Sequence, residues 1–293
     1  MTIYYCFFSN KLTGGLKVQL HHCRILKKYG FDVAQVVPEG SVPWWTGPSF
    51  EIISYDELYN RVKKDDWVVL SAIQDYDRVK DLKCRKCYLW QHFIINDYWL
   101  VSRKDWLVFT VSYFLKTQFE AVINRKIEVV PNGIDLNVFK PNGQKEPNRT
   151  FLLKYGEWKG YCKEAWQPLF SLLKDKLVIR HDLTEQQMVE ELQKSDIYIQ
   201  LTKFEGFGLP LLEAMACGCA CVDASVGTDD FSIDGVTSLK VPNTPGSVYS
   251  AVLKLLRDPE LKEKIREEGY KKAQEYSWDK IEPILVDFWR RHV

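Results

Sequence analysis

Residues 197–222 read IYIQLTKFEGFGLPLLEAMACGCACV and place a short helical segment between two apolar runs. The first run, residues 197–201, suits a buried strand, and a glycine-bearing turn separates it from a helix that begins near Pro210. The second run, residues 220–222, is again apolar. Two buried strands joined by a helix are typical of a parallel sheet with a right-handed crossover. The segment therefore indicates a fold of the α/β class.

The turn of this segment has the composition of an anion-binding site. Gly206-Phe207-Gly208-Leu209 contains two glycines, which lack a Cβ and let the backbone approach a ligand closely. The following helix start presents N–H groups and a positive dipole end. Glu205 precedes the helix and Glu213 lies inside it, so two carboxylates can bind hydroxyls at both ends of an elongated ligand. The structural alternative is an ordinary core helix that Glu205 caps.

Apolar runs of strand length recur along the chain, with segments of helical periodicity between them. Near the N-terminus a strand leads through paired glycines into a helix over residues 16–29, and Gly30 suits its C-cap. A second strand follows, as in the first parallel unit of a doubly wound sheet. We expect strands at residues 2–9, 31–37, 67–72, 87–91, 107–111, 128–130, 150–155, 177–180, 196–201 and 220–222.

The length of 293 residues suffices for two domains of ordinary size. Residues 142–148 (NGQKEPN) are polar and contain glycine and proline, which predicts a domain boundary. We therefore expect an N-terminal domain over residues 1–143 and a C-terminal domain over residues 144–278. A final helix is expected within residues 279–293.

Three segments resemble retaining glycosyltransferase family 4. Glu205 to Glu213 is an E-x7-E motif, residues 129–135 (VVPNGID) are similar to the PNGID passage between the family's two domains, and Ser277-Trp278 is similar to its "sW" pair. The resemblance is strong over residues 128–278 and weaker before them. It implies a GT-B fold, in which two Rossmann-like, doubly wound domains face a cleft and the last helix crosses back to the N-terminal domain.

The resemblance also implies the activity: a sugar moves from a nucleotide-diphosphate sugar to a saccharide or lipid-linked acceptor, with retention of anomeric configuration. Glu205 would hold sugar hydroxyls and stabilise the cationic transition state. Glu213 would bind the ribose hydroxyls, and the N–H groups of Gly206, Phe207, Gly208 and Leu209 would contact the phosphates. No metal cofactor is implied, because such a transfer depends on placement and on electrostatic stabilisation of the leaving group.

The family usually has an arginine and a lysine that neutralise the diphosphate. In the corresponding passage, KYGEWKG, Lys159 matches the lysine, whereas Glu157 stands where the arginine is expected. We expect Lys159 to contact the diphosphate. Either Lys154 or Lys203 replaces the missing arginine, or stabilisation of the leaving group depends more on the helix near Gly208.

Two further places suit a ligand in the N-terminal half. Gly14 and Gly15 follow the first strand and open a helix, so their N–H groups would face phosphate or acceptor. His92 follows the strand at residues 87–91, at the carboxyl edge where ligands bind in open α/β sheets. Family members often have a histidine there that touches the transferred sugar or the acceptor. The structural alternatives are a tight turn and a histidine at a strand end.

Three other functions remain open at this point, the third being an epimerase of nucleotide sugars with the GT-B fold. Asp75-Tyr76-Asp77 is a D-x-D sequence after an apolar run, the pattern with which GT-A type transferases hold a divalent metal on a diphosphate. A catalytically silent sugar-nucleotide-binding or assembly subunit would explain the missing arginine. Turnover without metal argues against the first, and any turnover argues against the second.

Composition limits the expected binding partners and the expected cellular location. The net charge of +1 disfavours nucleic acid as a partner. No apolar run reaches the roughly 18–20 residues of a membrane span, and the N-terminus reads as a strand, so we expect a cytoplasmic protein with reduced cysteines. Cys84 and Cys87 form a C-x2-C without a second pair, which does not predict a metal site. Aromatic and basic residues interleave over residues 78–106, which suits peripheral contact with the inner membrane face or, alternatively, core rings among solvated charges.

Overall fold

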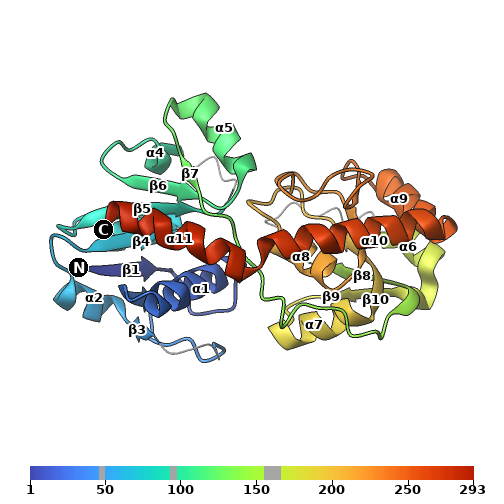
Figure 1. Cartoon of the computed structure of the whole chain (residues 1–293), viewed down its shortest axis with the longest axis horizontal. Helices are drawn as coiled ribbons and strands as arrows, with labels where there is room; N and C mark the ends of the chain where they lie inside the picture. The colour runs from blue at the N-terminus through green and yellow to red at the C-terminus, as the bar shows by residue number, and fades with distance from the viewer. Residues whose placement is uncertain (46–49, 93–97, 155–165) are drawn as a thin grey trace. The chain divides into compact units, whose positions relative to one another are not determined.

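The computed structural model describes residues 1–45, 50–92, 98–154 and 166–293, which form two compact units (Figure 1). The first unit comprises Met1–Asn132 and Ile281–Val293, and the second comprises Gly133–Lys280. Each unit has its own parallel sheet with helices packed on it. The prediction of two α/β domains with parallel sheets is confirmed.

The sheet of the first unit has seven parallel strands in the order β3-β2-β1-β4-β5-β6-β7. The chain moves outward from β1 to β3 and then returns to β4, so the strand order reverses beside β1. Ligands bind at such switch points in open α/β sheets. The strands are β1 (Thr2–Cys6), β2 (Asp32–Val36), β3 (Glu51–Ile53), β4 (Trp67–Leu70), β5 (Arg85–Trp90), β6 (Leu107–Thr110) and β7 (Glu128–Val129). The helices are α1 (Gly14–Lys28), α2 (Tyr55–Arg61), α3 (Tyr76–Val79), α4 (Tyr98–Val101) and α5 (Tyr113–Ile123), with a short 3-10 turn η1 (Ile73–Asp75).

Helix α1 begins at Gly14, two residues before the predicted start. Thr13 explains the difference, because its hydroxyl accepts the N–H of Leu16 and makes Thr13 the N-cap. Lys27 and Lys28 lie in the last turn, where cations interact favourably with the helix dipole. The buried face of α1 includes Leu16 and Leu20, which pack in one apolar cluster with side chains of the sheet edge. The helix therefore fixes the loop that follows β1.

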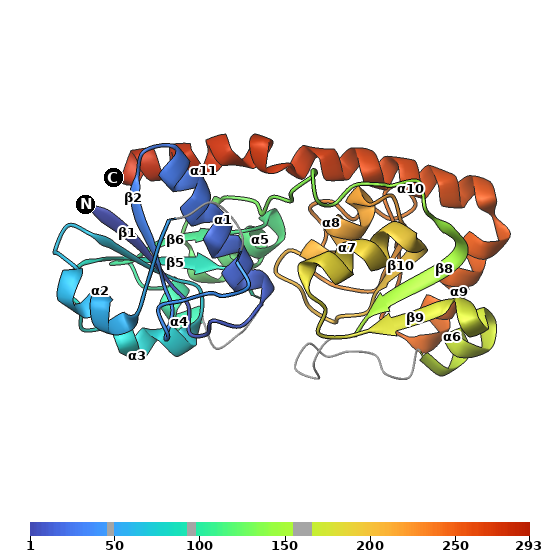
Figure 2. The same cartoon turned by 90° about the horizontal axis from the view of Figure 1, so that it is seen from below.

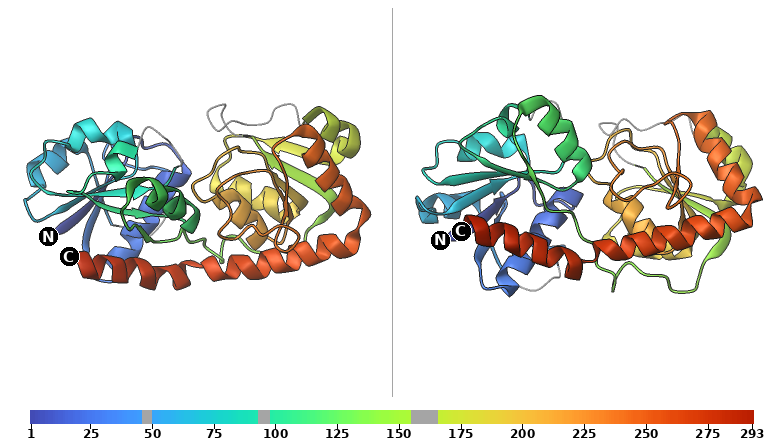
Figure 3. Two further views of the ribbon diagram at one scale, coloured as in Figure 1. Left: turned by 90° about the horizontal axis from the view of Figure 1, so that it is seen from above. Right: turned by 45° about the horizontal axis from the view of Figure 1, so that its top comes forward.

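The last helix, α11 (Trp278–His292), contributes residues 281–292 to the first unit. Leu285, Phe288 and Trp289 are buried there, and the ring of Phe288 packs against that of Phe109 in β6. Glu282 forms an ion pair with Lys28 of α1. Figure 3 shows the consequence, that the N- and C-termini of the chain lie side by side in this unit.

The second unit has a sheet of five parallel strands in the order β12-β11-β10-β8-β9. Three of these strands, β8, β9 and β10, are labelled in Figure 2. Apolar residues of β10 and β11 form the centre of its core, with α9 and α10 packed against them. The strands are β8 (Glu146–Leu153), β9 (Leu177–Arg180), β10 (Ser195–Gln200), β11 (Ala220–Asp223) and β12 (Leu239–Lys240). The helices are α6 (Trp166–Leu173), α7 (Glu185–Lys194), α8 (Leu209–Ala216), α9 (Pro245–Arg257) and α10 (Pro259–Ala273), with 3-10 turns η5 (Lys174–Lys176) and η6 (Gln274–Tyr276).

The boundary between the units lies after Asn132, ahead of the polar segment 142–148 on which the sequence places it. The N–H of Ile134 donates to the carbonyl of Tyr276 over 2.8 Å, and the N–H of Trp278 donates to the carbonyl of Ile134 over 3.2 Å. A Cβ on Gly133 would lie 2.5 Å from the Trp278 ring. Residues 133–135 are thus paired with residues 276–278, so two of the segments that carry the family resemblance are in direct contact.

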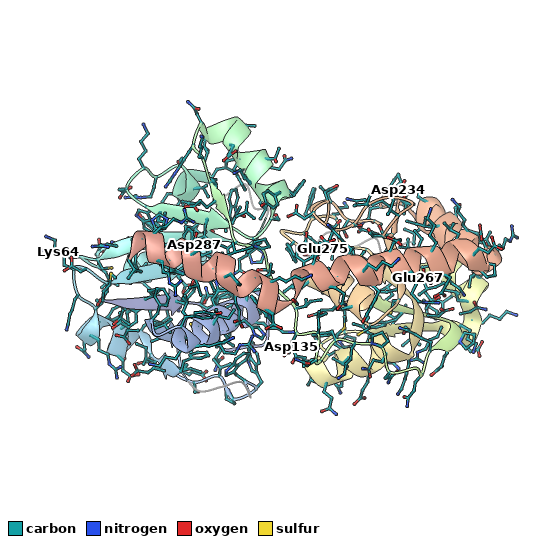
Figure 4. All side chains as sticks on the ribbon, in the orientation of Figure 1. Lys64, Asp135, Asp234, Glu267, Glu275 and Asp287 are labelled. Carbon is teal, nitrogen blue, oxygen red and sulfur yellow. The ribbon has the colours of Figure 1, made fainter. Side chains whose placement is uncertain are left out.

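Charged side chains cover the outer faces of the C-terminal helices. Figure 4 labels Glu267 on α10, Glu275 on η6 and Asp287 on α11, and all three are exposed. Their apolar neighbours Ile265 and Leu285 point into the cores. Within the residues that the structure describes, no helix combines the length and apolar character of a membrane span.

Candidate functional site

Backbone hydrogen bonds fix Glu205 at the carboxyl edge of the second unit's sheet. The N–H of Glu205 donates to the carbonyl of Val226 over 2.8 Å, and the N–H of Val226 donates to the carbonyl of Lys203 over 3.0 Å. Phe204 and Val226 thereby form a short parallel bridge beyond the ends of β10 and β11. The residue itself is 8% exposed. Glu205 is therefore held by two adjacent loops, and the turn and helix α8 follow directly.

The carboxylate of Glu205 accepts a hydrogen bond from a side chain of the preceding strand. Gln200, the last residue of β10, donates its amide N–H to Glu205 Oε1 over 3.1 Å. The N-cap position of α8 is occupied by Gly208, which has no side chain to cap the helix. Glu205 is therefore not the N-cap residue of α8.

Gly208 is required where the turn enters α8. Its backbone has φ +93° and ψ 46°, in the left-handed region that favours glycine. A Cβ at this position would also lie 2.7 Å from Cγ2 of Thr228. Pro210 follows within the first turn of the helix, where its missing N–H removes no intrahelical bond. The N–H groups at this helix start are those that a phosphate could accept from.

Phe207 and Glu213 occupy different surroundings within the turn and the helix. The ring of Phe207 is buried among aromatic side chains, 5.3 Å from that of Phe231 and 5.6 Å from that of Tyr276 between centroids. Phe207 can therefore meet a ligand through its backbone and not through its ring. Glu213 lies on the second turn of α8 and is 6% exposed. A carboxylate this buried among apolar helix neighbours needs hydrogen-bonding partners.

Asp223, at the end of β11, holds the loop that faces Gly208. Its carboxylate accepts the hydroxyls of Thr228 and Ser232, each over 2.6 Å, and the N–H of Ser225 over 2.9 Å. Burial raises the pKa of Asp223, against the lowering effect of these hydrogen bonds. Sequence reasoning missed this residue, although three hydroxyl residues after a strand that ends in aspartate were a usable signal.

Cationic side chains follow three neighbouring strands of the same sheet. Lys154 comes after β8, Arg180 ends β9 and Lys203 comes after β10, and all three are exposed. The N–H of Lys154 donates to the carbonyl of Arg180 over 2.7 Å, which places the ends of β8 and β9 together. Because carboxyl ends of parallel strands share one edge, these cations lie on the edge that carries Glu205. Lys159 lies outside the described residues.

The first unit brings Gly14 and Gly15 together with the end of β5. The amide of Gln91 donates to the carbonyl of Gly15 over 3.2 Å, and both residues are buried. A Cβ on Gly15 would lie 3.2 Å from the ring of Phe7, so this position has little room for a side chain, whereas Gly14 has open space around it. His92 follows Gln91 and is half-buried. Gln91 is a linking residue that sequence reasoning did not single out.

The D-x-D sequence does not form a metal-binding pair. Asp75 is fully buried, where it accepts the hydroxyl of Tyr55 and forms an ion pair with Arg78. Burial raises the pKa of Asp75 to about 6. The side chain of Asp77 is 82% exposed and pairs with Lys80. One carboxylate points into the core and the other into solvent, so this sequence gives no support to the GT-A alternative.

Among the described residues, no group of three or more His, Cys, Asp or Glu side chains is arranged to hold a metal ion. Seven of the eight cysteines lie in the described part of the chain, and these seven are free. Cys219 and Cys221 are buried near the start of β11, where burial raises the pKa of each thiol. These thiols therefore serve as small apolar groups.

A known protein family matches the part of the chain that contains this site. Residues 151–272 match the family model described as "Glycosyl transferases group 1". This region contains the whole segment from Gln200 through Glu213, together with Asp223 and its loop. The matched residues cover less than half of the chain, and over that part the chain resembles the group 1 glycosyltransferases.

Curated relatives show the same likeness over part of their length. An uncharacterized glycosyltransferase of Methanocaldococcus jannaschii is 23% identical over 199 residues, which cover 59% of this chain and 56% of the relative. The O-antigen chain mannosyltransferase B of Escherichia coli is 32% identical over 87 residues, 30% of this chain and 23% of the relative. A phosphatidyl-myo-inositol mannosyltransferase of Propionibacterium freudenreichii is 40% identical over 102 residues, 32% of this chain and 26% of the relative. The chain thus spans about half or less of the length of these relatives.

Solved structures share the fold over almost the whole chain. A sucrose-phosphate synthase from Thermosynechococcus elongatus superimposes with a TM-score of 0.77 at 13% identity and covers 99% of this chain and 98% of its own. HepE of Anabaena in complex with UDP-glucose gives a TM-score of 0.74 at 14% identity and covers 99% and 100%. At such identities the likeness establishes the fold alone, which is the two-domain GT-B fold.

Proposed function

We propose that this chain is a retaining glycosyltransferase, which moves a sugar from a nucleotide-diphosphate sugar to a saccharide or lipid-linked acceptor. The observation that carries the proposal is the buried carboxylate of Glu205, fixed directly before a glycine turn and the N-terminus of α8. This arrangement places a negative charge and a set of N–H donors next to each other. A sugar that develops positive charge while a diphosphate leaves needs both.

In this proposal, different residues of the second unit bind different parts of the nucleotide-sugar donor. Glu205 holds the sugar hydroxyls and stabilises the cationic transition state, and the N–H groups of residues 206–209 donate hydrogen bonds to the phosphates. Glu213 binds the ribose hydroxyls. Lys203 and Lys154, at the ends of β10 and β8, supply positive charge where the family has its arginine. Lys159 adds a further contact with the diphosphate.

The first unit binds the acceptor in this proposal. Gly14, with open space around it, and the N-terminus of α1 present backbone donors beside His92. The half-buried His92 contacts the transferred sugar or the attacking hydroxyl. The leaving diphosphate departs on the face that this hydroxyl attacks and accepts its proton, so the anomeric configuration is retained and no protein nucleophile is needed.

Thermal unfolding in the presence of nucleotide sugars tests the proposal. A donor at 100 times its dissociation constant adds about 2.7 kcal/mol of stability. A panel of UDP-glucose, UDP-N-acetylglucosamine, GDP-mannose and ADP-glucose should give a higher melting temperature with one base or sugar than with the others. Hydrolysis or transfer of that donor in excess EDTA then tests our proposal that no metal is required, and proton NMR of the first product gives the anomeric configuration. Binding without any turnover would instead favour a silent sugar-nucleotide-binding subunit.

Localisation and membrane contact follow from the same proposal. We infer a cytoplasmic enzyme, since nucleotide sugars are its donors, with peripheral contact at the inner membrane face where the acceptor is lipid-linked. Exposed aromatic side chains support such contact, with Trp99 of α4 at 42% exposure and Tyr113 of α5 at 61%. Sedimentation of the protein with anionic phospholipid vesicles at low and high salt measures it.

A further inference from the structure

Gln200 is fully buried at the end of β10, and both ends of its amide are engaged. Its Nε2 donates to Glu205 Oε1 over 3.1 Å and to the hydroxyl of Thr202 over 2.8 Å. Its Oε1 accepts the phenolic O–H of Tyr198 over 2.8 Å. The four side chains form one buried polar chain that leads from the core of the second unit to Glu205.

The orientation of this amide follows from the charge that it faces. In the reversed orientation, Oε1 of Gln200 would point at a carboxylate oxygen of Glu205, and two acceptors would oppose each other. The observed orientation places a donor there, and the hydroxyl of Tyr198 supplies a proton to the other end. Thr202 continues the chain to the hydroxyl of Ser225, 2.9 Å away, in the loop after β11. The network thus fixes one geometry for the carboxylate.

We propose that Gln200 is a positioning residue for Glu205, which holds the carboxylate in place for sugar transfer with a neutral N–H donor. The inference rests on the proposed function, because it assigns Gln200 an effect on the transfer step. The chemistry of the amide fits that task. A lysine or arginine at this place would neutralise the negative charge that the sugar cation requires, whereas an amide holds the oxygen and leaves the charge intact.

The first test replaces the amide by an apolar side chain of similar length. Gln200→Met removes the N–H that Glu205 accepts. We expect kcat for donor hydrolysis to fall about tenfold, while the dissociation constant of the donor changes less than threefold, because positioning acts on the transition state. The donor is whichever of UDP-glucose, UDP-N-acetylglucosamine, GDP-mannose and ADP-glucose the wild-type protein hydrolyses. An unchanged kcat, or an equal loss in binding and in turnover, overturns the proposal.

The second test gives a readout that a merely structural role would not change. Gln200→Glu places a second carboxyl about 3 Å from Glu205, and two carboxyl groups at that distance cannot both ionise near neutral pH. Where the pair holds one proton, the new O–H donates as the amide does, and activity is retained. Where both groups ionise, repulsion displaces Glu205 and activity is lost. We therefore expect an ionisation in the pH profile of kcat that the wild-type protein lacks.

Gln35 provides a matched control in the other unit. It is also a fully buried glutamine, in the interior strand β2 of a parallel sheet, and its amide donates to the carbonyl of Tyr5 and to Gln19. Gln35→Glu should lower stability without adding an ionisation to the kcat profile. The proposal is overturned when folded Gln200→Glu shows no new ionisation, or when Gln35→Glu shows the same one.

Failure of the proposed function has a separate signature. A wild-type protein that hydrolyses none of the four donors contradicts glycosyl transfer and, with it, the positioning role. The contact itself is then measured by a double-mutant cycle on unfolding with Gln200→Met and Glu205→Gln. If the two changes in unfolding free energy are coupled, Gln200 remains a structural partner of Glu205. If they are strictly additive, the contact between the two side chains is contradicted as well.

Discussion

The indole N–H of Trp289 donates a hydrogen bond of 2.9 Å to the phenolic oxygen of Tyr5, although 284 positions separate the two residues. Both side chains are fully buried in the first unit, and their rings meet edge to face with centroids 6.3 Å apart. Tyr5 lies in β1, an interior strand of the sheet, and Trp289 lies in α11. The bond ties the last helix to the centre of the first unit.

Trp289→Phe should destabilise the first unit by about 2–4 kcal/mol, because it removes a buried donor and leaves a cavity beside the Tyr5 hydroxyl. Tyr5→Phe removes the other partner at constant ring size and should cost less. Denaturant unfolding of both single variants and of the double variant gives the coupling energy, for which we expect about 1 kcal/mol. Additive effects would show that the hydrogen bond contributes nothing.

Glu205→Gln keeps the shape of the side chain and removes its charge. We expect kcat to fall by about 10²–10³, comparable to the loss of one preorganised electrostatic contact, while donor affinity changes by well under tenfold. Single-turnover transfer and donor binding, measured on the same folded variant, separate the two effects. Glu275→Gln, on the exposed turn η6, is the matched control and should behave as the wild type. Full activity in Glu205→Gln would contradict the catalytic role assigned to Glu205.

Glu213→Gln should weaken nucleotide binding itself, because a charged acceptor for the ribose hydroxyls is lost. Hydrogen bonds to charged groups contribute about 1.5–3 kcal/mol, which corresponds to a loss of about 10- to 100-fold in affinity. Calorimetric titration with UDP and GDP measures this directly and needs no turnover. Unchanged affinity for both nucleotides counts against the ribose assignment.

Gly208→Ala combines two unfavourable effects. The left-handed backbone costs an alanine about 1–2 kcal/mol, and its Cβ would lie 2.7 Å from Thr228. Gly143→Ala isolates the first effect, since Gly143 has φ +77° and open space around it. We expect a greater loss of stability for Gly208→Ala, with a loss of nucleotide affinity that Gly143→Ala does not share. Adding Thr228→Ser to Gly208→Ala removes the methyl group and keeps the hydroxyl that donates to Asp223. It should restore part of the stability and part of the nucleotide affinity.

The stability of the first unit should depend on pH through Asp75. Its pKa is raised by burial from its ordinary value of 3.8 to about 6, so between these values the folded state binds more protons than the unfolded state. Stability therefore falls as pH rises through this window, by roughly 2–3 kcal/mol, and is level above it. The groups that face the carboxyl are Tyr55, Arg78 and the buried thiol of Cys6.

Urea unfolding of the wild-type protein, Asp75→Asn and Asp77→Asn at pH 4 to 7 checks this dependence. Asp75→Asn should lose the slope between pH 4 and 6, because the amide does not titrate. Asp77→Asn changes the exposed member of the same D-x-D sequence, and this variant should keep the slope of stability between pH 4 and 6. Equal slopes in all three proteins would contradict a titrating Asp75.

Much of the fold was predictable because its strands are buried on both faces and read as apolar runs. All ten predicted strands are present, whereas β3 and β12 were missed. These two strands contain three and two residues and lie at sheet edges, where half-exposed positions break the apolar pattern. The predicted start of α1 was wrong by two residues, because the spacing of apolar residues does not reveal the N-cap that Thr13 provides.

The candidate site was predictable only where chain neighbours form it. Glu205, Gly208 and Glu213 lie within nine residues of sequence, so their spacing carried the inference. Contacts between strand ends could not be read in this way. Asp223 holds Thr228 beside Gly208, and Gln91 joins β5 to Gly15, through side chains whose partners are set by the tertiary fold.

Because α11 supplies Trp289 and Phe288 to the first unit, the order of synthesis and the order of folding differ. A ribosome releases residues 1–132 long before residues 281–293, and until then Tyr5 and Phe109 lack their helical cover. The second unit is contiguous and can complete its core first. The first unit thus completes its core only when residues 281–293 have emerged, and a nascent protein, or one cleaved before residue 281, presents an apolar sheet face to chaperones and proteases.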